Sequence, residues 1–281
     1  MKAARSNTQN KPETAEKMKE QTFKILAIGD VVGEAGTAFL EKRLPALKAE
    51  HRPELVIVNG ENACRNNGLD PAGAERIFAA GADLITTGNH VFRKKELYPV
   101  LDGEALLLRP ANFPGECPGK GTVIAPFRGV RILAVNLLGT LFMESLASPF
   151  ETMEKILRAE EGRYDFAVCD FHAEATSEKI AFARHFDGRV AVVFGTHTHV
   201  PTADLQIFPG GTAYITDLGM TGPADSVLGM KTESAIRRLV SKMPSYYEVA
   251  DGPCVLQGAL FECSDAGKVL STRQILETER E

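Results

Sequence analysis

Short apolar runs alternate along this chain with longer stretches whose apolar residues recur at helical spacing. Runs such as 55–58 (LVIV) contain no polar residue, as is typical of strands covered on both faces. Strands that alternate with helices predict a layered α/β fold. The expected strands are Phe23–Ile28, Leu55–Val58, Leu84–Thr86, Val130–Val135, Phe166–Val168, Val190–Phe194, Leu205–Phe208, Ala213–Thr216, Cys254–Phe261 and Val269–Ile275. The expected helices are Ala38–Ala49, Ala72–Ala80, Glu151–Arg158 and Glu178–His185.

The chain is expected to form one domain preceded by a polar tail. Residues 1–22 lack apolar periodicity, which begins only at Phe23. Residues 23–281 contain no internal repeat, low-complexity tract or Pro/Ser-rich linker that would mark a boundary. The 44% hydrophobic and 25% charged residues among 281 are ordinary for a globular protein and exclude collagen-like, coiled-coil and disordered chains.

Charge and cysteine usage exclude several further classes. The formal net charge of −5 argues against a protein built mainly to grip a nucleic-acid backbone. The apolar runs are too short to span a bilayer, and the N-terminus has no secretory apolar segment. The five cysteines are scattered without Cys-x-x-Cys spacing, so neither a zinc knuckle nor a redox dithiol is indicated. These features predict a cytoplasmic protein without a membrane partner.

Polar residues follow five of the expected strands at the point where each strand ends. The first three strands are followed by Gly29-Asp30, by 59–62 (NGEN) and by 87–90 (TGNH). Two later strands are followed by 170–172 (DFH) and 195–199 (GTHTH). Ligands bind at the carboxyl ends of the strands in open α/β sheets, so one shared site is expected there.

Four of the six histidines lie in these strand-end segments, beside acidic and amide side chains. The four are His90, His172, His197 and His199. Imidazole nitrogens mixed with carboxylate and amide oxygens suit first-row transition metals better than calcium or a thiolate site. His51 and His185 lie on expected helices, where a solvated surface position is predicted.

Each segment taken alone also has a simpler interpretation. Residues 29–36 contain three glycines, but their spacing differs from Gly-x-Gly-x-x-Gly, and Asp30 would face a pyrophosphate with negative charge. Asn62 and Asn89 could each cap a helix. His197 and His199 could end a strand with one ring inside and one outside. Only the gathering of all these residues at strand ends favours a metal site.

The order of these segments resembles the signature of the calcineurin-like metallophosphoesterases, and more closely their bacterial YmdB-type branch. The matching strings are GDVVG, NGENA, TTGNHVF, DFHAEATSEK, GTHTHVPTAD and AYITDLGMTGP, which together cover roughly residues 23–275. The resemblance implies a four-layer α-β-β-α sandwich, in which helices flank two mixed sheets. Val32 and Glu61 depart from the histidine and aspartate of the broad superfamily, as they do in the YmdB-type branch.

The resemblance also implies a pair of metal ions, with iron or manganese expected and zinc as an alternative. The ligands it implies for the first ion are Asp30, Glu61, Asn62 and His199. Those for the second ion are Glu61, Asn89, His172 and His197, with Glu61 bridging. His90 takes the role of the catalytic proton donor.

The activity implied by the resemblance is phosphodiester hydrolysis. A hydroxide shared by the two metals would attack phosphorus, and His90 would protonate the leaving oxygen. The expected substrate is a 2′,3′-cyclic nucleotide opened to a 3′-nucleotide, or another cyclic nucleotide. Two alternatives stay open: a phosphomonoesterase or protein phosphatase on the same site, and a regulatory protein that holds a nucleotide or RNA end with little turnover. A homo-oligomer is compatible with the resemblance.

Several further residues border these segments without a settled role. Arg65, Arg109 and Lys120 are candidates for binding phosphate, although each could equally be a solvated surface cation. Asp217 could accept a hydrogen bond from a ligand histidine or cap a turn. The roles of three others stay open, namely Cys64, Asp170 and Glu174.

Overall fold

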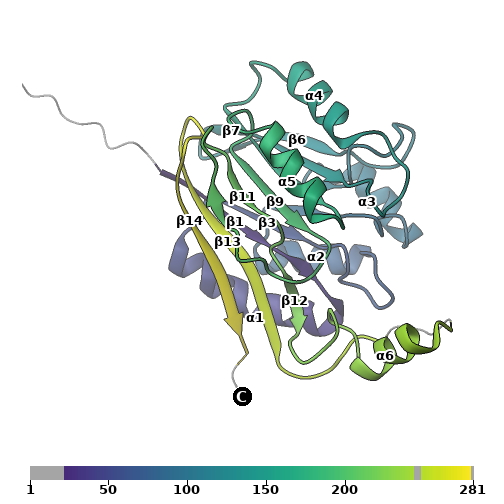
Figure 1. Cartoon of the computed structure of the whole chain (residues 1–281). Coiled ribbons are helices and arrows are strands. Elements are labelled where there is room, and N and C mark those ends of the chain that lie inside the picture. Colours follow the sequence, from purple (N-terminus) through teal and green to yellow (C-terminus); the bar gives the residue numbers. More distant parts are fainter. Residues whose placement is uncertain (1–21, 244–247, 280–281) are drawn as a thin grey trace, which may run out of the picture.

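Two β-sheets pack face to face, and helices cover both outer faces (Figure 1). The computed structural model describes residues 22–243 and 248–279. The four-layer α-β-β-α architecture implied by the sequence is therefore observed. Of the expected tail, residues 1–21 lie outside the described residues, and Thr22 already belongs to the first strand.

The first sheet has eight strands. Along its main path they are β2 (Asp30–Val31), β12 (Met220–Pro223), β13 (Cys254–Ser264), β1 (Thr22–Ile28), β3 (Leu55–Asn59), β4 (Leu84–Thr86) and β5 (Leu107–Leu108), with β14 (Val269–Thr278) paired to β13. Strands β1, β3, β4 and β5 run parallel to one another. Their carboxyl ends therefore lie along the same edge of the sheet.

The second sheet has six strands. In order they are β10 (Gln206–Ile207), β11 (Ala213–Ile215), β9 (Val192–Thr196), β8 (Phe166–His172), β7 (Val130–Leu138) and β6 (Thr122–Phe127). The four inner strands are parallel, whereas β10 and β6 pair antiparallel at the two edges. The carboxyl ends of β7, β8, β9 and β11 therefore also lie along one edge of this sheet.

Helices connect many of the strands, and two of them begin at a side chain that caps the helix. They are α1 (Gly33–His51), α2 (Pro71–Ala80), the 3-10 helix η1 (Lys95–Leu97), α3 (Tyr98–Gly103), α4 (Pro149–Ala159), α5 (Thr176–His185) and α6 (Thr232–Ser241). The Asp70 side chain caps α2 by accepting from the Gly73 amide at 2.7 Å, and Pro71 occupies the first turn. Ser148 caps α4 in the same way.

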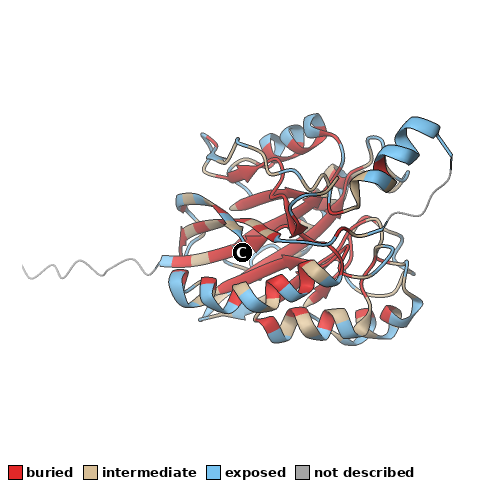
Figure 2. Ribbon diagram, turned by 90° about the horizontal axis from the view of Figure 1, so that it is seen from below, coloured by how far each residue is buried: buried red, intermediate tan, exposed pale blue. Residues whose placement is uncertain are grey.

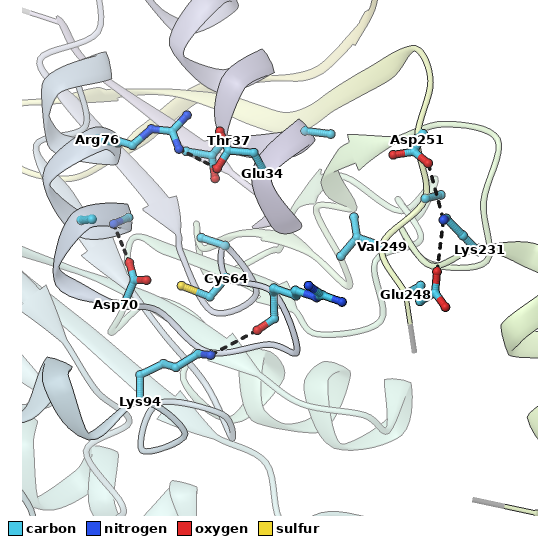
Figure 3. Close-up of a pocket in the computed structure, with 16 residues that line it drawn as sticks. Glu34, Thr37, Cys64, Asp70, Arg76, Lys94, Lys231, Glu248, Val249 and Asp251 are labelled. Atoms are coloured by element: carbon cyan, nitrogen blue, oxygen red, sulfur yellow. Dashed lines mark hydrogen bonds and ion pairs between the residues drawn. The ribbon is translucent and has the colours of Figure 1, made fainter. Parts of the chain in front are cut away.

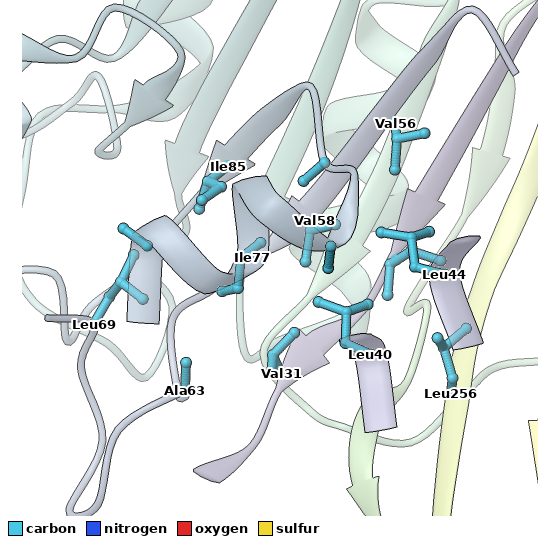
Figure 4. Packing of buried hydrophobic residues seen from close by; sticks show 14 of the residues in the cluster. Val31, Leu40, Leu44, Val56, Val58, Ala63, Leu69, Ile77, Ile85 and Leu256 are labelled. Carbon is cyan, nitrogen blue, oxygen red and sulfur yellow. The ribbon is translucent and has the colours of Figure 1, made fainter. Parts of the chain in front are cut away.

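Three apolar layers hold the elements together. The first lies between the first sheet and α1 and α2, where Leu40, Val58 and Ile77 pack together (Figure 4). The second lies between the sheets, and the third lies between the second sheet and α4 and α5. Successive residues Ile25 and Leu26 enter different layers because side chains alternate along a strand. Figure 2 shows the strands buried and the outer helix faces exposed.

Several sequence expectations need correction. Strand β8 does not end at Val168 but continues to His172, because its parallel pairing with β7 and β9 continues to that residue. His51 is buried rather than solvated, and its ring lies 2.8 Å from the Arg273 guanidinium. Several elements were not expected, namely β2, β5, β6, β12, η1, α3 and α6. Most of these are too short to show a periodic pattern.

Two expectations about the whole chain can be compared with the described residues. No helix among residues 22–243 and 248–279 is long and apolar enough to cross a bilayer. All five cysteines are unpaired.

Candidate active site and metal centre

The strand ends of both sheets meet at one place, and the polar residues that follow them face one another. Asp30 lies in β2 directly after β1, and His172 ends β8. Loops after β3, β4 and β9 carry the other residues, namely Glu61, Asn62, Asn89, His90, His197 and His199. Neither Asn62 nor Asn89 caps a helix, because α2 is capped by Asp70. All eight predicted residues thus lie in one cluster.

The side chains predicted for the first metal ion are in mutual contact. Asp30 Oδ1 lies 3.2 Å from Asn62 Nδ2 and 3.5 Å from His199 Nε2. Burial opposes ionisation of Asp30, but His199 and His172 outweigh it and hold the pKa of Asp30 below its usual range. Burial likewise opposes the charged form of His199, yet Asp30 raises the pKa of His199 to about 8.

The side chains predicted for the second metal ion surround one nitrogen of His172. His172 Nε2 lies 3.2 Å from Asn89 Oδ1, 3.1 Å from His197 Nδ1 and 3.7 Å from Glu61 Oε1. The other ring nitrogen, Nδ1, lies 2.9 Å from the Thr196 hydroxyl. Burial lowers the pKa of His172 well below its usual value, so the ring stays neutral, as a metal ligand requires.

Glu61 lies between the two groups and has one oxygen without a partner. Its Oε1 accepts from the His90 amide at 2.5 Å. Its Oε2 is buried and has no hydrogen-bond partner within the described part of the chain. Burial raises the pKa of Glu61 to about 8. A buried oxygen without a partner costs about 1–3 kcal/mol, a cost that a bound cation would remove.

The donor set fits a transition metal, although the side chains do not form a finished coordination shell. In the described ranges, no three Asp, Glu, His or Cys side chains are arranged as a complete metal site. The donor atoms given above are nevertheless 3.1–3.7 Å apart. Two atoms that each lie about 2.1 Å from one ion are roughly 3 Å apart, so small side-chain movements would suffice. The nitrogen and oxygen donors and the unpartnered Glu61 oxygen together suit such an ion.

The loop that carries His197 and His199 adopts an uncommon backbone conformation. Both residues have positive φ, at 98° and 63°. Both rings contact the cluster, His197 through His172 and His199 through Asp30, in contrast to a strand end with one ring inside and one outside. The His197 amide donates to Asp30 Oδ2 at 3.0 Å, which ties the loop to the first sheet. His199 Nδ1 donates to the Leu228 carbonyl at 3.0 Å, which leaves Nε2 facing Asp30.

A buried ion pair stabilises the backbone of the loop that carries His197 and His199. Lys179 Nζ donates to Asp217 Oδ2 and to the Thr196 carbonyl, both at 2.8 Å. Asp217 Oδ2 also accepts from the Thr198 amide at 3.1 Å. Asp217 therefore holds the backbone of the loop, and it also accepts from the Gly219 amide at 2.9 Å. Of the two roles that the sequence left open, these contacts fit the turn cap.

Two residues left open by the sequence contact the cluster. Asp170 is buried and accepts from Asn59, Thr86 and Thr196, whose hydroxyl in turn contacts His172. Burial raises the pKa of Asp170 to about 7. Glu174 Oε2 lies 3.1 Å from His197 Nε2, and it does not cap α5. No sequence signal separated these two carboxylates from ordinary turn residues.

His90 is held in one tautomer by a neighbouring cation. Arg93 Nε donates to His90 Nδ1 at 2.9 Å, so Nδ1 is the acceptor and the ring proton lies on Nε2. Burial and the charge of Arg93 lower the pKa of His90 to about 4. His90 is therefore a neutral imidazole, and its Nε2–H makes no hydrogen bond within the described part of the chain.

The three candidate phosphate-binding cations lie outside the cluster. Arg109 is buried and donates to the carbonyls of Pro110 at 2.8 Å and Pro118 at 3.1 Å, which argues against a role in phosphate binding. Lys120 is exposed and lines neither of the two cavities near the strand-end loops. Arg65 lines a cavity that contains none of the predicted ligands.

Two cavities adjoin the loops. A cavity of about 280 Å³ opens beside Asn89 and His90. A larger one of about 550 Å³ lies between α1, α2 and the segment around Val249, with Cys64 on its wall (Figure 3). Burial raises the pKa of Cys64 to about 12, which disfavours the thiolate, the reactive form.

Comparison with known proteins identifies the family. A sequence model described as YmdB-like protein matches residues 26–275. The chain belongs to the YmdB-like family. This YmdB-like chain is 43% identical over 246 residues to a Bacillus subtilis (strain 168) protein named 2′,3′-cyclic-nucleotide 2′-phosphodiesterase, covering 88% of this chain and 93% of that protein.

Solved structures support the same assignment. A Mycoplasma pneumoniae structure, named a novel phosphatase, superposes with a TM-score of 0.87 at 38% identity, covering 92% of this YmdB-like chain and 95% of that chain. The sulfate thiohydrolase SoxB of Thermus thermophilus superposes with a TM-score of 0.53 at 14% identity, covering 89% and 43%. At that identity only the fold is shared. The expected family, fold and enzyme class are confirmed.

The unpartnered oxygen of Glu61 predicts a pH-dependent stability of the metal-free protein. The pKa of Glu61 is about 8 when folded against 4.5 when unfolded, so stability falls as pH rises between these values. Glu61→Gln removes this titration. In EDTA-treated samples, the melting temperature of the wild type should fall relative to that of Glu61→Gln between about pH 5 and 8. Parallel profiles of the two proteins would contradict the buried, unpaired carboxylate.

The ion pair beneath the histidine loop predicts a second stability effect. Lys179→Met leaves Asp217 buried without its cation and should cost about 3–5 kcal/mol in the free energy of unfolding. Adding Asp217→Asn should recover much of this loss. Urea denaturation measures all three proteins, with exposed Lys155→Met as the matched control. A Lys179→Met variant as stable as this control would show that the pair does not support the loop.

Proposed function

We propose that this YmdB-like chain is a metal-dependent phosphodiesterase that opens 2′,3′-cyclic nucleotides to 3′-nucleotides. The observation that carries the proposal is the gathering of nitrogen and oxygen donors around the unpartnered Glu61 oxygen, with the His90 donor beside them. The 43% identity to the B. subtilis phosphodiesterase supports this substrate class.

The residues that would hold two transition-metal ions divide into two sets that share Glu61. The first set is Asp30, Glu61, Asn62 and His199, and the second is Glu61, Asn89, His172 and His197. Iron and manganese suit these donors, as does zinc. Bound ions would neutralise the charge of the phosphoryl oxygens and lower the pKa of water.

His90 supplies a hydrogen-bond donor for the leaving ribose oxygen. Its proton is on Nε2 because Arg93 occupies Nδ1. A neutral imidazole donates a hydrogen bond to negative charge that develops on the leaving oxygen, and the adjacent guanidinium makes its N–H more acidic. Arg93 therefore orients His90 and strengthens its Nε2–H as a donor.

A phosphomonoesterase is the second candidate, supported by the phosphatase name of the M. pneumoniae structure. The same donors would bind a terminal phosphate. Rates on bis-p-nitrophenyl phosphate and p-nitrophenyl phosphate separate the two activities, and a phosphodiesterase should prefer the diester.

The proposed function predicts metal content and product together. Freshly purified protein should contain about two equivalents of transition metal by ICP-MS, as a two-metal site requires. It should convert 2′,3′-cyclic AMP to 3′-AMP, identified by chromatography. Release of 2′-AMP would refute the proposed bond cleavage, and absence of metal after reconstitution would refute the metal centre.

His90→Asn tests the proton donor separately from the metal site. The variant should retain its metals but lose about 10²–10³-fold in kcat on 2′,3′-cyclic AMP, as loss of one hydrogen-bond donor to developing negative charge does. The loss should be smaller on bis-p-nitrophenyl phosphate, whose leaving group needs no proton. The exposed His185→Asn is the matched control. Equal losses on both substrates would remove His90 from this role.

A further inference from the structure

The cavity of about 280 Å³ beside His90 has the composition of a binding site for an aromatic group. It is lined by Asn89, His90, Phe92, Arg93, Phe113 and Glu144, so it shares two residues with the candidate active site. Ligand pockets combine apolar or aromatic walls with a few polar groups, and this cavity is at the small end of their size range. We propose that it is the nucleoside subsite, in which Phe92 and Phe113 contact the base, an inference that rests on the proposed function.

The two phenylalanines form a fixed pair. Their ring centroids are 5.2 Å apart at 81°, and Phe92 also packs edge-on against Tyr98 at 5.7 Å. The Tyr98 hydroxyl donates to the Phe92 carbonyl at 3.0 Å, which holds this segment in place. Both phenylalanines are only partly buried, so their rings remain accessible from the cavity. Any of the nucleobases can stack favourably on such rings, because every base has an aromatic face.

The walls of the cavity are fixed by buried hydrogen bonds. Asn112, next to Phe113, donates to the carbonyls of Leu138 at 2.8 Å and Ala147 at 3.1 Å, and accepts from the Leu138 amide at 2.9 Å. These bonds join the segment that carries Phe113 to both ends of the loop that carries Glu144. Buried Glu178 holds the start of that loop by accepting from the Thr140 amide at 2.9 Å. A wall fixed in advance reduces the entropy lost on binding.

The two charged groups of the cavity define the orientation of a bound nucleotide. Arg93 contacts His90, so its positive charge lies at the catalytic end. Glu144 is exposed and makes no hydrogen bond or ion pair in the described part of the chain. Its carboxylate repels a phosphate but can accept from a ribose hydroxyl or a base amino group. The phosphate is therefore placed toward Arg93 and His90, and the nucleoside toward Glu144 and the phenylalanines.

The larger cavity of about 550 Å³ is a poorer candidate for the same group. Most of its charged side chains are already paired: Arg76 with Glu34, and Lys231 with Glu248 and Asp251 (Figure 3). None of its lining residues belongs to the predicted metal or proton-donor set, and none is aromatic. Of these two cavities, only the smaller combines aromatic walls with contact to His90.

Phe113→Ala tests the subsite with two substrates that differ only in the base. These are 2′,3′-cyclic AMP and the 2,3-cyclic phosphate of methyl riboside, in which methoxy replaces adenine. The variant should raise KM for 2′,3′-cyclic AMP by roughly 5- to 100-fold, as loss of one stacking contact does, and leave KM for the methyl riboside nearly unchanged. Phe113→Leu, which keeps apolar volume, should give a smaller effect of the same kind.

Phe78→Ala is the matched control, because Phe78 is also partly buried against the first apolar layer but lies on α2 outside the cavity. It should change neither KM. Metal content of every variant is measured by ICP-MS, so that a lost metal is not mistaken for a lost subsite. Equal increases in KM for both substrates with Phe113→Ala would overturn the proposal, as would equal KM values in the wild type.

Calorimetric binding of 3′-AMP and of the 3-phosphate of methyl riboside gives a readout that does not need turnover. The wild type should bind 3′-AMP more tightly, and Phe113→Ala should abolish the difference. If the wild type hydrolyses neither cyclic phosphate but shows this binding difference, the proposed function fails and the subsite stands. If it hydrolyses both and binds both products equally, the subsite fails and the proposed function stands.

Discussion

The buried carboxylate of Asp30 joins the two sheets at the candidate site. Its Oδ1 contacts Asn62, which follows β3 of the first sheet, and its Oδ2 accepts from the His197 amide, which follows β9 of the second. A single charged group is thus shared between two loops that are far apart in sequence. The positive φ of His197 and His199 is maintained because these contacts, together with the Lys179–Asp217 pair, stabilise a backbone that would otherwise be unfavourable.

Burying several charged groups at the ends of the strands lowers the stability of the fold. Apolar packing elsewhere in the molecule compensates for this loss. Glu61 and Asp170 both have pKa values raised by burial, to about 8 and about 7. The burial of apolar side chains in three layers stabilises the fold and offsets this loss. The polar groups are at the ends of parallel strands, where the layers stop, so they leave the apolar packing intact. Such strained and charged regions are typical of functional sites.

The sequence was most informative where an apolar run is followed directly by polar residues. Continuous apolar runs predicted the central strands, and polar residues directly after them predicted which side chains would meet. It was uninformative for β2 and β12, which have two and four residues and exist mainly through pairing with neighbouring strands. The role of Asp170 was equally hidden, because only the alignment of β3, β4, β8 and β9 brings Asn59, Thr86 and Thr196 around it. Nothing in the sequence indicated that Phe92 and Phe113 would be in contact.

His90 contacts the cluster of predicted metal ligands and also lines the cavity, as does its partner Arg93. The guanidinium fixes the proton of His90 on Nε2 by donating to Nδ1, and the same side chain lines the cavity. A nucleotide placed with its phosphate near Arg93 therefore meets a donor whose tautomer is already set. Arg93 would also draw the phosphate charge toward the metal ligands. In the proposed function, recognition of the nucleotide and the hydrogen bond from His90 would both depend on one short segment after β4. Glu61 holds this segment through the His90 amide.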